Sequence, residues 1–286
     1  MSAAGGANGS ADSETGSETD AFDPDALGAL YADAREAEDS GDHEKAIALF
    51  NACLLMDPAD HCGVSLRLAA LGAAAPQRAP AAYVATLFDQ TAPRFDAVLV
   101  GQLGYDVPAL ARRLVARHQA PSTATRLLDV GCGTGLVGLA FQDDAGEMIG
   151  LDLSEDMLAF ADERGTYADL YVGDAVSFMD EWDEAPFDLI VAADVLPYLG
   201  DLTPFMAAAA HALRPGGLLA ASTERCDAGW AVTATQRFAH STLYVTGVMG
   251  AAGLDLLAAE PITVRHEEGS PVLGDLLLGQ KRPSSP

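Results

Sequence analysis

The sequence predicts an α/β protein in which a doubly wound sheet of seven strands follows an N-terminal helical hairpin. Apolar runs of strand length recur through the second half of the chain, helical segments separate most of them, and a glycine-rich loop follows the first. Parallel strands need crossover connections, which these helices supply. The predicted strands are residues 126–130, 148–153, 170–172, 187–192, 218–221, 254–258 and 272–278.

The first 75 residues divide into an acidic tail and a helical hairpin. Residues 1–24 have no aromatic residue before Phe22, and such small and acidic residues bury too little apolar surface to fold, so disorder is expected. Apolar residues then recur at helical spacing, break at 40–42 and resume at 43–56. This pattern predicts two antiparallel helices within residues 25–75, with a capping helix within 61–72.

The remainder, residues 81–286, is predicted to be one α/β domain that begins with covering helices. Residues 72–80 form the expected linker because they are rich in Pro and Ala. Beyond them the pattern is helical, with breaks at Pro93 and Pro108 before the first strand.

The composition excludes several classes of protein. The chain has 286 residues and a net charge of -26, so it would repel nucleic acid phosphates. No apolar run approaches the ~18 residues of a membrane span, and no basic and apolar leader opens the chain, so a cytoplasmic location is expected. No Cys lies at metal-ligand or disulfide-framework spacing, which predicts neither zinc nor another metal. The cysteines are Cys53, Cys62, Cys132 and Cys226.

The glycine-rich loop is compatible with two cofactors. Its second half, Gly133–Gly138, formally matches the Rossmann fingerprint of dinucleotide sites. Asp152, at the end of the second predicted strand, suits either cofactor because a carboxylate can accept protons from two ribose hydroxyls. Asp129 distinguishes the two cofactors, because a carboxylate there would repel the pyrophosphate of a dinucleotide and attract the cationic amino-acid part of S-adenosylmethionine. The loop therefore favours S-adenosylmethionine over a nicotinamide cofactor.

From residue 81 to about 280 the chain resembles the class I S-adenosylmethionine-dependent methyltransferases. Their motifs occur in the right order: LLDVGCGTG, IGLDLSEDML, LYVGDA, FDLIVAADVLPYL and ALRPGGLLAAST. The segment GDHEKAIALFNACLLMDPAD resembles a single tetratricopeptide repeat, although its first helix matches poorly. The whole chain thus resembles the predicted bacterial methyltransferases that contain such repeats.

The resemblance implies an S-adenosylmethionine site built from the loops after successive strands. The methionine end would bind the glycine loop, an acid would bind the ribose, an apolar side chain would pack on the adenine, and a further acid would bind the adenine edge. In that order the residues are Asp129, Gly131, Gly133 and Gly135; Asp152; Leu153 or Met157; and Asp174 with Ala175. Asp174 could instead cap a helix, and Met157 could be ordinary core.

The first helices of this domain resemble the covering helix of small-molecule methyltransferases. Tyr83, Phe88, Phe95 and Asp96 are the candidates for closing the cofactor pocket, and ordinary helix packing is the alternative.

The acceptor site is expected beyond the fourth and fifth strands. Asp194 would face the methionine amino group or the acceptor. Arg237 and His240 could converge on one pocket, with Arg237 binding an acidic acceptor and His240 acting as a base; alternatively, both are structural. Tyr198 and Trp230 are candidate walls.

These features predict methyl transfer to a small or medium-sized acceptor at O, N or C. The acceptor is expected to be a small molecule, and the sequence DVLPY lacks the pattern of amino-group methylation on nucleobases. One alternative is an interaction protein whose repeat binds a partner or a second copy and whose methyltransferase fold is inactive. Another is a nicotinamide-dependent oxidoreductase.

Overall fold

The computed structural model describes residues 24–120 and 122–283. The acidic tail predicted at residues 1–24 lies outside this range except for Pro24, which is the first residue of a helix. No helix in the described part of the chain is long and apolar enough to cross a bilayer.

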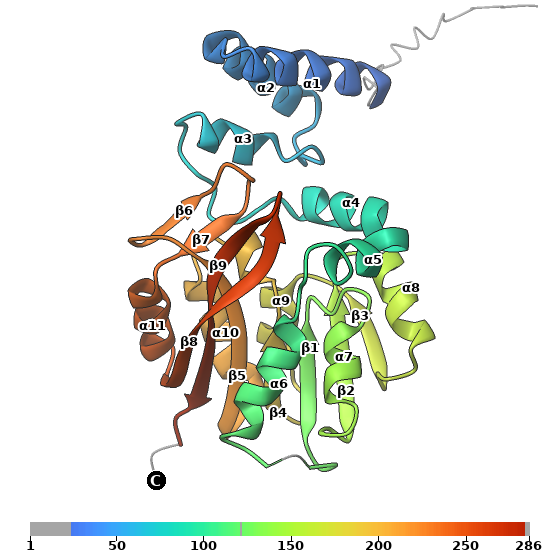
Figure 1. Ribbon diagram of the computed structural model, residues 1–286, viewed down its shortest axis with the longest axis vertical. Helices are drawn as coiled ribbons and strands as arrows, with labels where there is room; N and C mark the ends of the chain where they lie inside the picture. The colour runs from blue at the N-terminus through green and yellow to red at the C-terminus, as the bar shows by residue number, and fades with distance from the viewer. Residues whose placement is uncertain (1–23, 121, 284–286) are drawn as a thin grey trace, which may run out of the picture.

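The centre of the molecule is a mixed sheet (Figure 1). Parallel strands in the order β3-β2-β1-β4-β5 form its first part, and β9 then pairs antiparallel with both β5 and β8. A short antiparallel pair, β6 and β7, joins the end of β5. The strands are β1 (Arg126–Val130), β2 (Glu147–Asp152), β3 (Asp169–Val172), β4 (Phe187–Ala192), β5 (Leu213–Arg225), β6 (Trp230–Val232), β7 (Phe238–His240), β8 (Leu254–Glu267) and β9 (Ser270–Lys281).

The α/β sheet is confirmed, but its strand count differs from the prediction. The described residues form nine strands where seven were expected. Each predicted strand is present, and the two additional ones are β6 and β7. Both have three residues, which is too short for alternation of apolar and polar side chains to register as a pattern.

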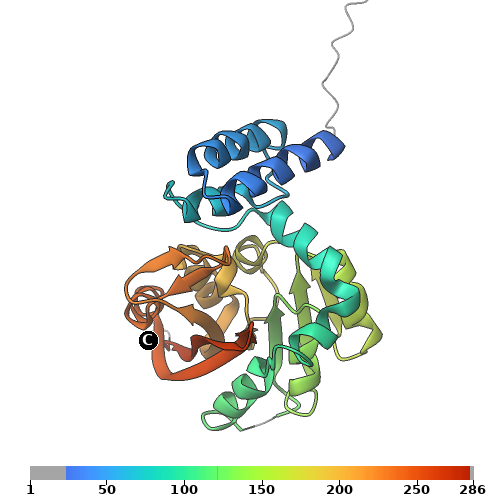
Figure 2. The ribbon, with the colours of Figure 1, turned by 45° about the horizontal axis from the view of Figure 1, so that its top comes forward.

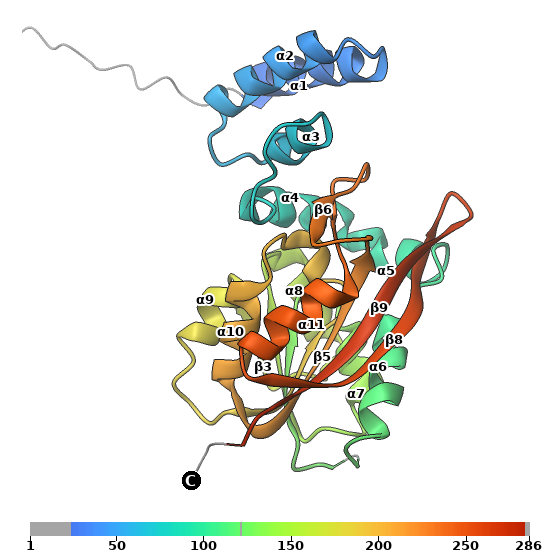
Figure 3. The ribbon, with the colours of Figure 1, turned by 90° about the vertical axis from the view of Figure 1, so that its left-hand side faces the viewer.

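Helices cover both faces of the sheet and bury it on two sides (Figure 3). One core packs α9 (Ala175–Asp180), α10 (Thr203–Ala212) and α11 (Thr242–Ala251) on the strands. The other packs α6 (Val107–Ala116) and α7 (Leu136–Phe141), and α8 (Glu155–Glu163) lies beside β2 and β3. The central strands β1 and β4 are therefore almost wholly buried, and most of their residues are apolar, as expected for strands covered on both faces.

The N-terminal helices form a separate apolar cluster at one end of the molecule (Figure 2). Helices α1 (Pro24–Asp39) and α2 (His43–Met56) are antiparallel, and α3 (Val64–Ala70) packs beside α2. The side chain of Asp60 stabilises the start of α3, because it accepts hydrogen bonds from the backbone N–H groups of Val64 at 2.6 Å and Ser65 at 2.9 Å. The predicted helices are present, and their assignment to a tetratricopeptide repeat stays a prediction.

The segment predicted as a linker is fixed to the sheet domain at its second half. The carbonyl of Gln77 accepts hydrogen bonds from the N–H groups of Gly200 (2.8 Å) and Asp201 (2.9 Å). The N–H of Ala79 donates to the carbonyl of Tyr198 at 2.8 Å. Residues 77–79 therefore attach the helical unit to the loop that follows β4.

The side chain of Leu66 on α3 anchors the helical unit to the sheet domain. It is fully buried in an apolar cluster that also contains Tyr198 and Phe238. Leu66→Ala should lower the free energy of unfolding by about 2–5 kcal/mol, because it leaves a cavity in this cluster. Leu55→Ala is the matched control, since the Leu55 side chain on α2 is 84% exposed. Thermal unfolding of the two variants tests this; equal melting temperatures would show that the anchor is unimportant.

Candidate active site

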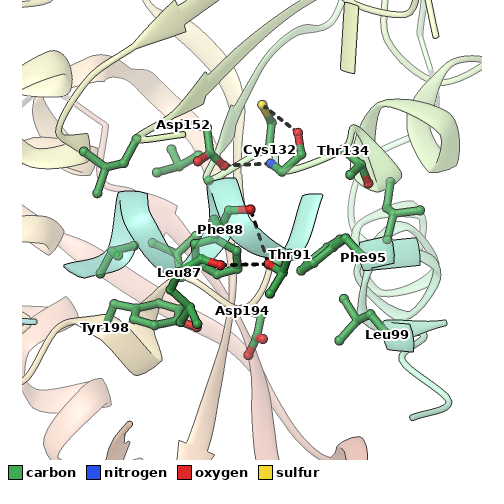
Figure 4. A pocket seen from close by; sticks show the side chains of 18 of the residues that line it. Leu87, Phe88, Thr91, Phe95, Leu99, Cys132, Thr134, Asp152, Asp194 and Tyr198 are labelled. Atoms are coloured by element: carbon green, nitrogen blue, oxygen red, sulfur yellow. Dashed lines mark hydrogen bonds between the residues drawn. The ribbon is translucent and has the colours of Figure 1, made fainter. Parts of the chain in front are cut away.

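A cavity of about 550 Å³ opens where β1, β2 and β4 end and the covering helices pass over them (Figure 4). Its floor comes from the loops that follow these strands, and its roof comes from α4 (Ala81–Thr91), the 3-10 turn η1 (Ala92–Arg94) and α5 (Phe95–Leu99). Carboxyl ends of parallel strands are where such folds bind ligands. The volume falls within the usual range for small-molecule sites.

The glycine loop adopts a conformation that disfavours other residues. Gly131 and Gly133 have φ angles of 64° and 53°, and both line the cavity. A Cβ on Gly131 would lie 2.4 Å from Cγ2 of Val195. Gly135, at φ 88°, begins α7 and does not line the cavity. Glycine at these positions thus lets the backbone turn closely around one end of the cavity.

Asp152 connects this loop to the end of β2. Its Oδ2 accepts a hydrogen bond from the N–H of Gly133 at 2.8 Å, and its Oδ1 accepts one from the N–H of Ser154 at 3.0 Å. Burial raises the pKa of Asp152, while these backbone hydrogen bonds oppose the rise. Its carboxylate lines the cavity, where each oxygen has a remaining lone pair for a ligand hydroxyl.

Asp129 lies beneath the loop and does not line the cavity. Its side chain is fully buried, and Oδ2 accepts a hydrogen bond from the Tyr167 hydroxyl at 2.6 Å. Burial raises its pKa to about 8, against the opposing effect of that hydrogen bond. Its Oδ1 has no hydrogen-bond partner among the described residues. An unpaired buried carboxylate oxygen is costly, and a nearby cation would relieve that cost.

Three of the residues predicted to contact adenine line the cavity. Leu153, Asp174 and Ala175 line the cavity, whereas Met157 is fully buried and does not. Asp174 caps α9, accepting a hydrogen bond from the N–H of Ser177 at 3.1 Å, and it also forms an ion pair with Arg78 at 3.0 Å. The structure therefore gives Asp174 a capping role and a place at the cavity together, and it favours the core interpretation for Met157.

The covering helices are attached to the cavity floor by hydrogen bonds. Phe88 and Phe95 line the roof, as predicted for this segment. The hydroxyl of Thr134 donates to Asp96 at 2.6 Å, and Arg164 forms an ion pair with the same carboxylate. Tyr83 instead packs against Gly63 at the start of α3 and does not line the cavity.

The far end of the cavity is charged. Asp194, which follows β4, has an unusual φ of 65° and lines the cavity. Arg237, in the turn between β6 and β7, forms an ion pair with Asp194 at 2.7 Å. The charged group has two further members that were not predicted from the sequence, Glu224 on β5 and Arg265 on β8, which form an ion pair at 2.8 Å. Both residues lie beyond the strands predicted at 218–221 and 254–258, because β5 and β8 are longer than the apolar pattern indicated.

His240 does not join this group, which corrects the expectation that it converges with Arg237. The ring is fully buried at the end of β7 and does not line the cavity. Its Nε2 lies 2.8 Å from the carbonyl oxygen of Leu199 and 3.1 Å from that of Gly200, so it donates to them. Burial lowers the pKa of His240. Because its ring is neutral and its Nε2 proton is donated to these two carbonyls, His240 has a structural role. Trp230 likewise lies outside the cavity lining, while Tyr198 is part of it.

Comparison with known proteins identifies the central segment. Residues 127–217 match the model of a family described as a methyltransferase domain. The chain is 35% identical over 99 residues to a ubiquinone biosynthesis O-methyltransferase of Nitrobacter winogradskyi, covering 34% of this chain and 38% of that protein. It is 31% identical over 126 residues to one from Maricaulis maris, covering 43% and 49%. It thus spans less than half the length of these relatives.

Solved structures share the fold at low identity. The structure of the [4+2]-cyclase SpnF aligns with a TM-score of 0.58 at 21% identity, over 70% of this chain and 96% of that one. A 1,6-didemethyltoxoflavin-N1-methyltransferase of Burkholderia thailandensis, solved with S-adenosylhomocysteine, aligns with a TM-score of 0.56 at 18% identity, over 73% and 93%. These identities support a common fold.

The fold, the glycine loop and the matched segment agree with one another. Residues 127–217 match a methyltransferase domain. The residues fit S-adenosylmethionine, because tightly turned glycines and a ribose-compatible carboxylate line one end of the cavity, and an unpaired buried carboxylate oxygen lies beneath the glycine loop.

The raised pKa of Asp129 predicts a pH-dependent contribution to stability. The unfolded carboxyl titrates near 3.8 and the folded one near 8, so the native state binds the extra proton between these values. This contribution is fully present below pH 4 and is lost as the pH rises through 8, at about 1.4 kcal/mol per pH unit. Asp129→Asn lacks it and keeps an acceptor for Tyr167.

The test is the free energy of unfolding of both proteins at pH 5.5, 7 and 8.5, without cofactor. The advantage of the native protein over Asp129→Asn should shrink as the pH rises. A constant difference across this range would contradict a raised pKa.

Proposed function

We propose that this protein transfers a methyl group from S-adenosylmethionine to a small or medium-sized acceptor. The observation that carries the proposal is the hydrogen bond between Gly133 and Asp152 at the floor of a cavity that continues to Asp194. It joins the loop that would hold the methionine end to the carboxylate that would hold the ribose. The matched methyltransferase segment supports the same function.

In this proposal each part of the cavity contacts one part of the cofactor. Backbone groups of the glycine loop and Asp129 would stabilise the charged amino-acid end, with Gly135 shaping the loop from outside the cavity. Asp152 would accept protons from the ribose hydroxyls. The adenine would pack on Leu153. Asp174 and Ala175 would contact its edge, and Arg78 holds the carboxylate of Asp174 in place.

The cofactor would supply a methyl group already activated by the positive charge on sulfur, so the protein needs mainly to align the acceptor and exclude water. Phe88 and Phe95 on the covering helices would exclude water. Asp194 and Arg237 would contact the acceptor at the far end, where Asp194 can take a proton.

Ligand-dependent unfolding tests the cofactor. S-adenosylhomocysteine at ~100 times its dissociation constant should add about 2.7 kcal/mol and raise the melting temperature by roughly 5–10 °C. Asp152→Ala should abolish most of the shift. Asp162→Ala, on the exposed side of α8, should retain it. NAD should give no shift; a shift with NAD alone would overturn the proposal in favour of an oxidoreductase.

A second candidate is a fold that binds the cofactor without turnover. The similar fold of a protein described as a [4+2]-cyclase shows that this architecture occurs in proteins named for other reactions. Binding of S-adenosylmethionine with no methyl transfer to any acceptor tested would favour this candidate.

We propose that the N-terminal helices pack against the sheet domain and support the acceptor end. The resemblance to one tetratricopeptide repeat leaves open a protein partner or a second copy as its ligand. Packing is supported by residues 77–79, which bond to the loop after β4, and by Leu66. A single repeat also lacks the concave surface with which arrays bind peptides.

A further inference from the structure

Acidic residues greatly outnumber basic ones in this chain, so an arginine without a carboxylate partner is unusual. The sequence has 42 Asp and Glu residues against 16 Lys and Arg residues. Within residues 24–120 and 122–283, the side chain of Arg94 forms no ion pair, hydrogen bond or ring contact, whereas every other arginine pairs with Asp or Glu. Arg94 also lines the cavity and is exposed.

Most of the charged side chains that line the cavity neutralise one another. A guanidinium that already contacts a carboxylate has little free charge for a ligand, and a carboxylate beside a guanidinium is in the same position. The ion pairs of the lining are Arg78 with Asp174 at 3.0 Å, Arg237 with Asp194 at 2.7 Å, and Arg265 with Glu267 at 2.6 Å.

Two charged residues of the lining stay outside these pairs, Asp152 and Arg94. Asp152 accepts backbone hydrogen bonds and keeps lone pairs for ligand hydroxyls. Arg94 keeps its whole set of N–H donors, because no group of the described chain accepts from them. The cavity therefore has one accessible cation whose charge is not offset by the protein.

The residues that follow Arg94 place it beside the glycine loop. Arg94 ends the turn η1, and Cε1 of Phe95 lies 3.8 Å from the position that a Cβ on Gly133 would take. The carboxylate of Asp96 accepts the hydrogen bond from Thr134 at 2.6 Å. Figure 4 shows Phe95 and Thr134 on the same side of the cavity. Arg94 thus belongs to the part of the roof that covers the proposed methionine end.

We propose that Arg94 binds a carboxylate of a ligand in this cavity. The proposal rests on the proposed function and adds a binding residue to it. A guanidinium can donate two parallel N–H hydrogen bonds to a carboxylate, which a neutral group would not match. A carboxylate near Asp152 also needs a cation beside it, because the two negative charges would otherwise repel one another.

Under the proposed function, two ligands can supply this carboxylate. The cofactor carries an α-carboxylate at its methionine end, beside the ammonium group for which Asp129 lies beneath the loop. The acceptor is the other source, and its apolar part would then contact Val98 and Leu99, which line the cavity farther along α5. The contacts of Phe95 and Asp96 with the glycine loop favour the cofactor.

Two cofactor analogues test the first source. They are S-adenosylhomocysteine and the analogue in which hydrogen replaces its α-carboxylate, and isothermal titration of the full chain measures both dissociation constants. Arg94→Met should weaken binding of S-adenosylhomocysteine about five- to tenfold, as expected for a partly exposed, hydrogen-bonded ion pair, and leave binding of the analogue unchanged. Arg94→Lys should retain part of the affinity, because the charge remains while the planar fork is lost.

Arg113→Met is the matched control. Arg113 on α6 is exposed, pairs with Asp106 and does not line the cavity. The substitution removes the same charge as Arg94→Met, so an effect of net charge alone would appear in both variants. Arg113→Met should bind both ligands with the affinity of the native protein.

Two further probes test the second source on protein saturated with S-adenosylhomocysteine. The probes 4-butylbenzoate and 4-butylbenzamide share an apolar part and differ in charge. If the acceptor supplies the carboxylate, the native protein prefers the benzoate, and Arg94→Met loses this preference without a change in its affinity for S-adenosylhomocysteine.

The remaining outcomes overturn the proposal or separate it from the proposed function. Equal weakening of S-adenosylhomocysteine and its decarboxylated analogue would show that Arg94 only supports the turn, and unchanged binding of all these ligands by Arg94→Met would show that it binds none of them. If S-adenosylhomocysteine does not bind the native protein, the proposed cofactor is wrong. The benzoate and the benzamide, measured without it, then decide the role of Arg94 by themselves.

Discussion

The carboxylate of Asp152 is the interaction on which the site depends. It joins the N–H groups of Gly133 and Ser154, and so connects the loops that follow the two adjacent strands β1 and β2. Ser154 extends the connection to the roof, because its hydroxyl donates to Asp89 on α4 at 2.5 Å. One buried acid thus aligns the floor and the roof of the cavity while still facing it.

A second constraint acts at the other end of the cavity. The chain after β4, the end of β5, the β6–β7 turn and the β8–β9 hairpin all contribute charged side chains to one buried group. Removing one member would leave the others unpaired in a poorly solvated place, which is strongly unfavourable.

The N-terminal helices and the segment that follows them contact residues near this charged end of the cavity. Residues 77–79 bond to the backbone around Tyr198, and Tyr198 in turn accepts a hydrogen bond from Arg237. Leu66 packs into the same cluster. The helical unit therefore packs behind Tyr198, which lines the cavity, and a change in its packing would reach Arg237 through Tyr198.

The sequence by itself determined the α/β class, the glycine loop and the acids at or near the carboxyl ends of β1, β2 and β4, because buried strands and positive-φ glycines leave local patterns. It could not determine which of these residues face the cavity. Asp129, Met157 and His240 are buried away from it, whereas Arg265 lines its far end and pairs with the buried Glu224 on a strand distant in sequence. Only the tertiary structure decides this, since ion pairs between segments depend on register and packing that no local pattern records.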